Sequence, residues 1–198
     1  MKEISAMKKK KCKICGGSLV DFLTYENMPK AAQYFPDAKT MSDDLGILLE
    51  ILQCEGCGTV QIPAKPVSYY SRAIRSPSWN IDPFRRKQRD EFIKEFHLQN
   101  KQIMQIMKEP KPDRYNAFLM FNYLEHFPSP KETLMQICDS LEEPGVGIIE
   151  VPNFEEIISE RIFGEFIVDH LFYFTQETLR FVCVASGFDV LRIHEIWE

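Results

Sequence analysis

The pattern of hydrophobic and polar positions is clearest in the second half of the chain. Two short apolar runs, Tyr115–Phe121 and Val146–Val151, have the length of buried strands. Residues 188–196 have a similar composition and predict a third strand. These runs therefore predict a small sheet in the second half.

Two helices are expected between these strands. Ser129 as N-cap, Pro130 at the first helical position and Glu132 as the third helical residue predict a capping box at the first helix. Thr175 is expected to cap the second helix, which stops at Gly187. Alternation of strands and helices is typical of an α/β domain with parallel strands and right-handed crossovers.

The first half of the chain is less regular. Apolar segments precede Pro63 and Pro66, which mark a linker. An amphipathic stretch after Pro83 has close to helical spacing, and Ile103–Met107 predicts either a short strand or one more helical turn. We therefore expect a small domain over residues 1–66 and an α/β domain over residues 67–198.

The composition excludes several classes of function. Of 198 residues, 44% are hydrophobic and 15 are phenylalanines, which is enough for a packed core. The net charge of −5 argues against a nucleic-acid surface. There is no apolar run of about 18 residues to predict a membrane span, and no apolar stretch after lysines 8–11 to predict a signal peptide. We therefore expect a cytoplasmic protein.

Two cysteine pairs carry the clearest chemical signal. Cys12 and Cys15 form one C-x-x-C knuckle, Cys54 and Cys57 form a second, and a glycine follows each pair. Glycine at this place can take positive φ and turn backbone N–H groups toward the sulfurs. Four thiolates suit a structural zinc site with no open coordination position. The alternatives are unrelated thiols or two disulfides, and a bridge between cysteines three residues apart is usually strained.

An ordered set of motifs resembles a known family. The set comprises the two knuckles, Tyr-Tyr-Ser at 69–71, Asn-x-x-x-His-x-Pro at 122–128, Glu-Val-Pro-Asn at 150–153 and Asp-His-x-x-Tyr-Phe-Thr at 169–175. It resembles S-adenosylmethionine-dependent methyltransferases with an N-terminal zinc-binding domain, including C-methyltransferases of deoxysugar pathways. The resemblance covers most of residues 12–198. It implies a partial Rossmann-like methyltransferase sheet and a sugar-derived small molecule as methyl acceptor.

The resemblance also implies catalytic roles. In this family the histidine of the Asp-His-x-x-Tyr-Phe motif lies at the substrate, which makes His170 the candidate general base. A base near neutral pKa would remove a proton from carbon beside a ketone, and the enolate would attack the methyl sulfonium. Asp169 would orient or tune His170, and Tyr173 would line the pocket. Ile167 stands where the family often has a tyrosine, and the alternative is that Asp169 and His170 form a structural loop pair.

Three further residues are expected near the cofactor or substrate. His126 follows the strand that ends at Asn122, and ligands of α/β proteins bind at the carboxyl ends of parallel strands. The resemblance assigns Asn122 and Tyr70 to the cofactor and His126 to the catalytic site. The alternatives are a histidine that packs near the start of the next helix, and ordinary linker aromatics at Tyr69 and Tyr70.

One part of the family pattern is missing. The family has a glycine-rich cofactor loop after a strand close to Ile103–Ile106, whereas Met107–Pro112 contain no glycine. The eight residues 107–114 are also too few for a parallel crossover, which needs about a dozen. Three hypotheses remain: a methyltransferase, a non-catalytic zinc-binding protein without cofactor, and an internally deleted form of a full enzyme. A partial sheet leaves an exposed edge, so we also expect a homo- or hetero-oligomer.

Overall fold

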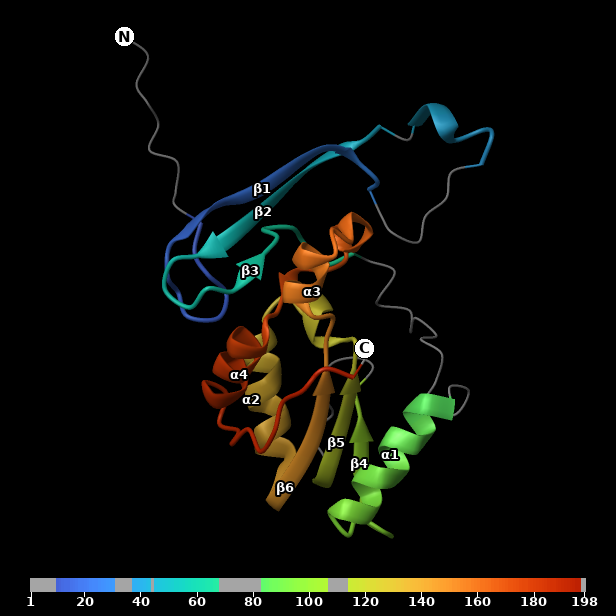
Figure 1. Ribbon diagram of the computed structural model, residues 1–198, viewed down its shortest axis with the longest axis vertical. Helices are drawn as coiled ribbons and strands as arrows, with labels where there is room; N and C mark the ends of the chain where they lie inside the picture. Colours follow the sequence, from blue (N-terminus) through green and yellow to red (C-terminus); the bar gives the residue numbers. More distant parts are fainter. Residues whose placement is uncertain (1–9, 31–36, 44, 68–82, 107–113, 197–198) are drawn as a thin grey trace.

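The computed structural model describes residues 10–30, 37–43, 45–67, 83–106 and 114–196, and places most of their regular elements in or around two sheets (Figure 1). The strands are β1 (Leu19–Met28), β2 (Ile47–Cys54), β3 (Val60–Gln61), β4 (Ile103–Gln105), β5 (Tyr115–Phe121), β6 (Leu141–Glu150) and β7 (Phe172–Tyr173). The helices are α1 (Pro83–Glu95), α2 (Pro130–Ser140), α3 (Phe154–Ser159) and α4 (Gln176–Val184), with short 3-10 turns η1 (Met41–Asp43), η3 (Leu124–His126) and η4 (Phe163–Glu165).

The second half of the chain forms a parallel sheet in the order β4-β5-β6. Strand β5 is central, and its alternate residues enter different cores. Ala117, Leu119 and Phe121 pack with Phe92 and Leu98 on the α1 side. Phe118 and Met120 face the core that holds the apolar residues of α2 and α4, and Figure 1 shows these two helices on the side opposite α1. The expected α/β class with a partial Rossmann-like sheet is confirmed.

The second sheet is antiparallel and has the order β1-β2-β3-β7. Its last strand comes from the other end of the sequence: Val60 pairs with Tyr173 and Gln61 with Phe172. The cysteine-bearing segment and the segment after His170 therefore share one sheet. This pairing brings the two groups of candidate site residues onto a common scaffold.

The expected third strand is wrong. Residues 188–196 adopt no regular secondary structure. The segment instead contributes side chains to the core, where Phe188 packs against Phe118 with ring centroids 5.6 Å apart and Val190 lies beside the same cluster. Its apolar pattern therefore reflects side-chain packing without a backbone ladder.

The sequence predicts the start of one helix better than the start of the other. Thr175 caps α4 as expected: its side chain accepts a hydrogen bond from the Thr178 amide, and the Thr178 hydroxyl accepts one from the Thr175 amide. Pro130 does occupy the start of α2, but the capping box is wrong, because the Ser129 side chain makes no cap hydrogen bond. Ser129 takes part in the helix start only through its backbone carbonyl, which accepts a 3.0 Å hydrogen bond from the Thr133 amide.

In the described part of the chain, no helix has both the length and the apolar character needed to cross a membrane.

Candidate metal centre and histidine cluster

The four cysteines of the two knuckles converge at one end of the antiparallel sheet. Cys12 and Cys15 precede β1, Cys54 ends β2 and Cys57 lies in the turn before β3. All four sulfurs lie within 4.8 Å of one another, with separations of 3.4 Å between Cys15 and Cys54 and 3.7 Å between Cys12 and Cys57. All are free thiols. The two-disulfide alternative therefore finds no support in this geometry.

Backbone and side-chain donors surround these sulfurs. The Gly56 amide donates to Cys54 at 3.3 Å, the Ile14 amide to Cys12 at 3.4 Å and the Gly17 amide to Cys15 at 3.4 Å. Gln61 of β3, which no sequence motif indicates, donates its side-chain amide to Cys12 at 3.2 Å. Donors of this kind stabilise thiolates, and thiolates are the form that binds metal.

The glycines after the knuckles have the conformation that the sequence predicts. Gly16 has φ +75° and Gly58 has φ +76°, values that residues with a Cβ rarely adopt. Burial opposes ionisation of Cys54, but donation by the Cys57 and Gly56 amides lowers the pKa of this thiol to about 7. Four converging sulfurs with N–H donors fit a tetrahedral zinc ion.

The two candidate histidines meet beside the carboxyl end of the parallel sheet. His126 lies in η3, directly after β5, and His170 lies just before β7. Their ring centroids are 4.9 Å apart. His126 Nδ1 forms a 2.9 Å hydrogen bond with the carbonyl of Asp169, so Asp169 contacts His126 through its backbone. The structure thus brings together the three residues proposed as catalytic from sequence.

The carboxylate that lies beside His170 belongs to Glu165. Glu165 Oε2 lies 3.6 Å from His170 Nδ1. The Tyr173 hydroxyl donates to the Glu165 carbonyl at 3.2 Å and accepts the Ile167 amide at 3.3 Å. Tyr173 therefore holds the loop that carries both Glu165 and His170, and its ring centroid is 6.2 Å from that of His170.

Glu125 completes this group, although no sequence motif singles it out. The residue is 1% exposed, and Oε1 lies 3.6 Å from His126 Nε2. Among the described residues, neither of its carboxylate oxygens has a hydrogen-bond partner. The position next to His126 is the one sequence signal that could have drawn attention to it.

Burial controls the protonation of this cluster. It raises the pKa of Glu125 to about 8, and the nearby Glu150 carboxylate acts in the same direction. It lowers the pKa of His170 to about 4, with the neighbouring His126 adding to the effect. Burial also lowers the pKa of His126. At neutral pH both imidazoles are therefore neutral, with a lone pair on one ring nitrogen.

The polar residues at the ends of β5 and β6 contact one another. Glu150 forms a mostly buried ion pair with Arg85 of α1, and the Arg85 guanidinium lies 4.7 Å from the centroid of the Phe121 ring. With its amide oxygen toward α1, Asn122 accepts from Arg85 Nη2 at 3.2 Å and donates to Glu150 Oε1 at 3.3 Å. Tyr69 and Tyr70 lie outside the described residues.

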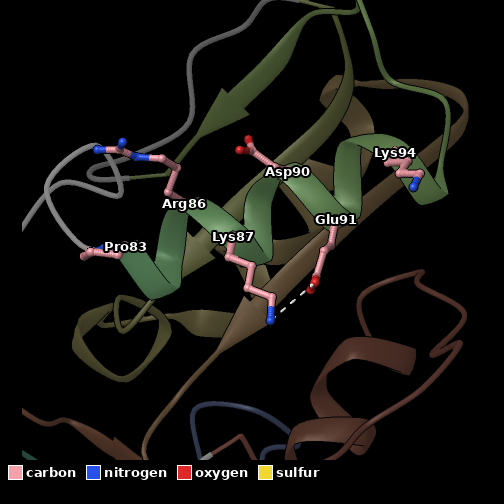
Figure 2. A pocket seen from close by; sticks show the side chains of 6 residues that line it. All are labelled: Pro83, Arg86, Lys87, Asp90, Glu91 and Lys94. Carbon is pink, nitrogen blue, oxygen red and sulfur yellow. Dashed lines mark ion pairs between the residues drawn. The ribbon is translucent and has the colours of Figure 1, made fainter.

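Figure 2 shows a hollow on the surface of α1. It is lined by Pro83, Arg86, Lys87, Asp90, Glu91 and Lys94. Lys87 and Glu91 form an exposed ion pair there at 3.9 Å. None of the candidate site residues lines this hollow, and its charges of both signs favour no particular ligand.

Comparison with known families places this fold in a class. A family model described as a methyltransferase domain matches residues 46–193, which is more than half of the chain. The chain therefore belongs to this methyltransferase domain family. Membership points to S-adenosylmethionine as the methyl donor. A comparison with curated proteins gave no match.

The described residues do not fit the cofactor that the family implies. Asn122, which the resemblance assigns to S-adenosylmethionine, is engaged by Arg85 and Glu150. The sequence between β4 and β5 has no glycine to let backbone approach a ligand closely, and residues 107–113 lie outside the described part. The described residues therefore provide no evident place for this cofactor.

Proposed function

We propose that this protein is a methyltransferase-type enzyme that acts on a small, sugar-derived molecule by C-methylation. The observation that carries the proposal is the meeting of His126 and His170 beside the carboxyl end of β5, in a chain of the methyltransferase domain family. The protein's own part in such a reaction would be to generate a carbon nucleophile on the methyl acceptor.

In this proposal His170 removes the proton from the acceptor carbon. The imidazole is neutral at physiological pH, because burial lowers its pKa to about 4, so it can accept a proton. This pKa lies below the near-neutral value that the resemblance implies for the base, so His170 accepts a proton less readily than that role requires. Asp169 and Tyr173 act as positioning residues, the first through its carbonyl on His126 and the second through the loop that carries His170.

The four cysteines have a structural role in this proposal. A zinc ion held by Cys12, Cys15, Cys54 and Cys57 has no open position for substrate, so it would stabilise the antiparallel sheet. We place the protein in the cytoplasm, where thiols remain reduced and available for zinc.

A second candidate function is a non-catalytic zinc-binding protein of the same family. The mutual contacts of Arg85, Glu150 and Asn122 favour it, because these groups engage one another at the end of the sheet where a ligand would bind. Such a protein would act through a second copy or another partner. Large apolar side chains on the surface, including Leu48 and Phe163, are compatible with such contacts.

Calorimetric titration of S-adenosylmethionine into the zinc-loaded chain separates the two candidates. Binding in the micromolar range supports the enzyme, and turnover should then be abolished in His170→Ala and retained in His194→Ala, which changes a histidine outside the cluster. If millimolar cofactor produces neither heat nor a thermal shift, the enzyme proposal fails and the non-catalytic one stands.

A further inference from the structure

The histidine cluster has the composition and spacing of a metal site. Glu125, His126 and His170 each offer one ligand atom, and the three atoms lie within 4.8 Å of one another. In a tetrahedral zinc site with bonds of about 2.0–2.1 Å, neighbouring ligand atoms are about 3.4 Å apart. The 3.6 Å separation of Glu125 Oε1 and His126 Nε2 is close to that value.

We propose that Glu125, His126 and His170 bind a divalent transition-metal ion, in a centre distinct from the four cysteines. Two imidazoles and one carboxylate suit zinc and cobalt, and three protein ligands leave a coordination position open for water or another small ligand.

The orientation of His126 supports this proposal. The hydrogen bond between Nδ1 and the Asp169 carbonyl requires the proton on Nδ1, because a carbonyl only accepts. The Nε2 lone pair is then directed to the side where Glu125 lies. Histidine ligands of metals commonly donate their second N–H to a backbone carbonyl in this way, which fixes both tautomer and ring angle.

The environment of Glu125 is the second observation. A buried carboxylate that has no hydrogen-bond partner among the described residues loses its hydration without replacement. Neutralisation by a proton removes the charge, but a metal ion would also occupy the oxygen lone pairs. A proton would be shared with one imidazole at most, whereas a metal ion would engage the carboxylate and both imidazoles at once.

Glu165 provides an outer contact for the third ligand. Its carboxylate oxygen lies 3.6 Å from His170 Nδ1, the arrangement in which a carboxylate orients a histidine ligand.

This inference does not rest on the proposed methyl transfer. Metal binding needs no S-adenosylmethionine and is measured without it. The two uses of His170 exclude each other in one molecule, because an ion and a proton require the same lone pair. A metal-loaded centre would therefore inhibit proton removal by His170.

Titration with Co²⁺ of the full chain, zinc-loaded at its cysteines, tests the proposal. We expect a second, saturable equivalent with d–d absorption and no thiolate-to-cobalt charge-transfer band. Glu125→Gln and His170→Asn should each weaken binding at least about tenfold, whereas His194→Ala should leave it unchanged. Glu125→Gln preserves the shape of the side chain and removes a group that can ionise, so the fold of this variant can be verified by thermal unfolding.

Three outcomes would overturn the proposal. The first is no saturable cobalt binding up to millimolar metal. The second is a thiolate charge-transfer band, which would place the ion at the cysteines. The third is unchanged affinity in the folded Glu125→Gln and His170→Asn variants.

Discussion

At the scale of single residues, Gly147 of β6 lies directly beside the ring of Phe118 on the neighbouring strand β5. It pairs in register with Phe118. A Cβ at position 147 would overlap Cε1 of the Phe118 ring. The glycine therefore gives Phe118 the space from which its ring reaches Phe188.

We expect Gly147→Ala to destabilise the protein by about 1–3 kcal/mol, because the ring or the strand must move. Gly164→Ala is the matched control, since a Cβ there meets no atom within 4 Å. Urea unfolding of both variants measures the difference. Equal stability of the two would show that Phe118 repacks without cost.

Cys183 on α4 predicts a dependence of stability on alkaline pH. Burial raises the pKa of this thiol to about 11, so the folded state keeps a proton that the unfolded chain loses from about pH 9. Unfolding then releases a proton, and stability contributed by this group falls as pH rises from about 9 to 11, at up to about 1.4 kcal/mol per pH unit. Urea unfolding at pH 8.5–10.5 should show the advantage of the wild type over Cys183→Ala shrinking. A constant difference would contradict the raised pKa.

At the scale of elements, the two helices on one face of the parallel sheet begin in different ways. Helix α4 has reciprocal side-chain hydrogen bonds between Thr175 and Thr178. Helix α2 has Pro130 at its start but no side-chain bond from Ser129, whose φ is −141° and ψ is 72°. A similar sequence signature thus produces a cap in only one helix, because capping depends on the backbone angles of the cap residue.

We expect Thr175→Ala to lower the free energy of unfolding by about 0.5–2 kcal/mol, since the amide of Thr178 loses its partner. Ser129→Ala should change it by less than about 0.5 kcal/mol, because only the retained carbonyl takes part. Thermal or denaturant unfolding compares them, and a larger loss in Ser129→Ala would contradict the observed caps.

Elements that carry their own periodicity can be predicted from the sequence. Strand β5 has the bounds that its apolar run predicts, and α4 has the predicted N-cap, because buried runs and caps are local signals. Strands β3 and β7 cannot be predicted in this way, since each has only two residues and therefore no periodic pattern. They also pair with each other, although they lie far apart in the sequence. Residues 188–196 have the apolar pattern of a strand but do not form one, because their apolar side chains pack against the core without strand pairing.

At the scale of the whole molecule, the antiparallel sheet joins the cysteine centre to the histidine cluster. Cys12, Cys54 and Phe172 belong to one hydrophobic core with residues of β5 and α2. The cysteine set is predictable from spacing alone. Glu125 and Gln61 are not, because nothing in the sequence indicates that these polar side chains are buried.

We expect Cys54→Ser to lose about one equivalent of zinc relative to the wild type, with loss of the antiparallel sheet. The physical reason is that three remaining sulfurs hold zinc weakly, while the knuckles depend on the ion to stay together. Cys138→Ser, outside the cluster, is the control and should keep its zinc. Metal analysis and thermal unfolding measure both effects, and a zinc-free Cys54→Ser protein of native stability would contradict a structural ion.

The pairing of β3 with β7 also dictates an order of events during synthesis. Val60 and Gln61 leave the ribosome more than a hundred residues before Phe172 and Tyr173. At roughly 5–20 residues per second, the edge of β3 waits roughly 5–20 s for its partner. During that interval the nascent chain carries an exposed sheet edge, which is a template for pairing with other chains. Early zinc capture by the two knuckles would hold that edge in a fixed, short hairpin until the last strand arrives.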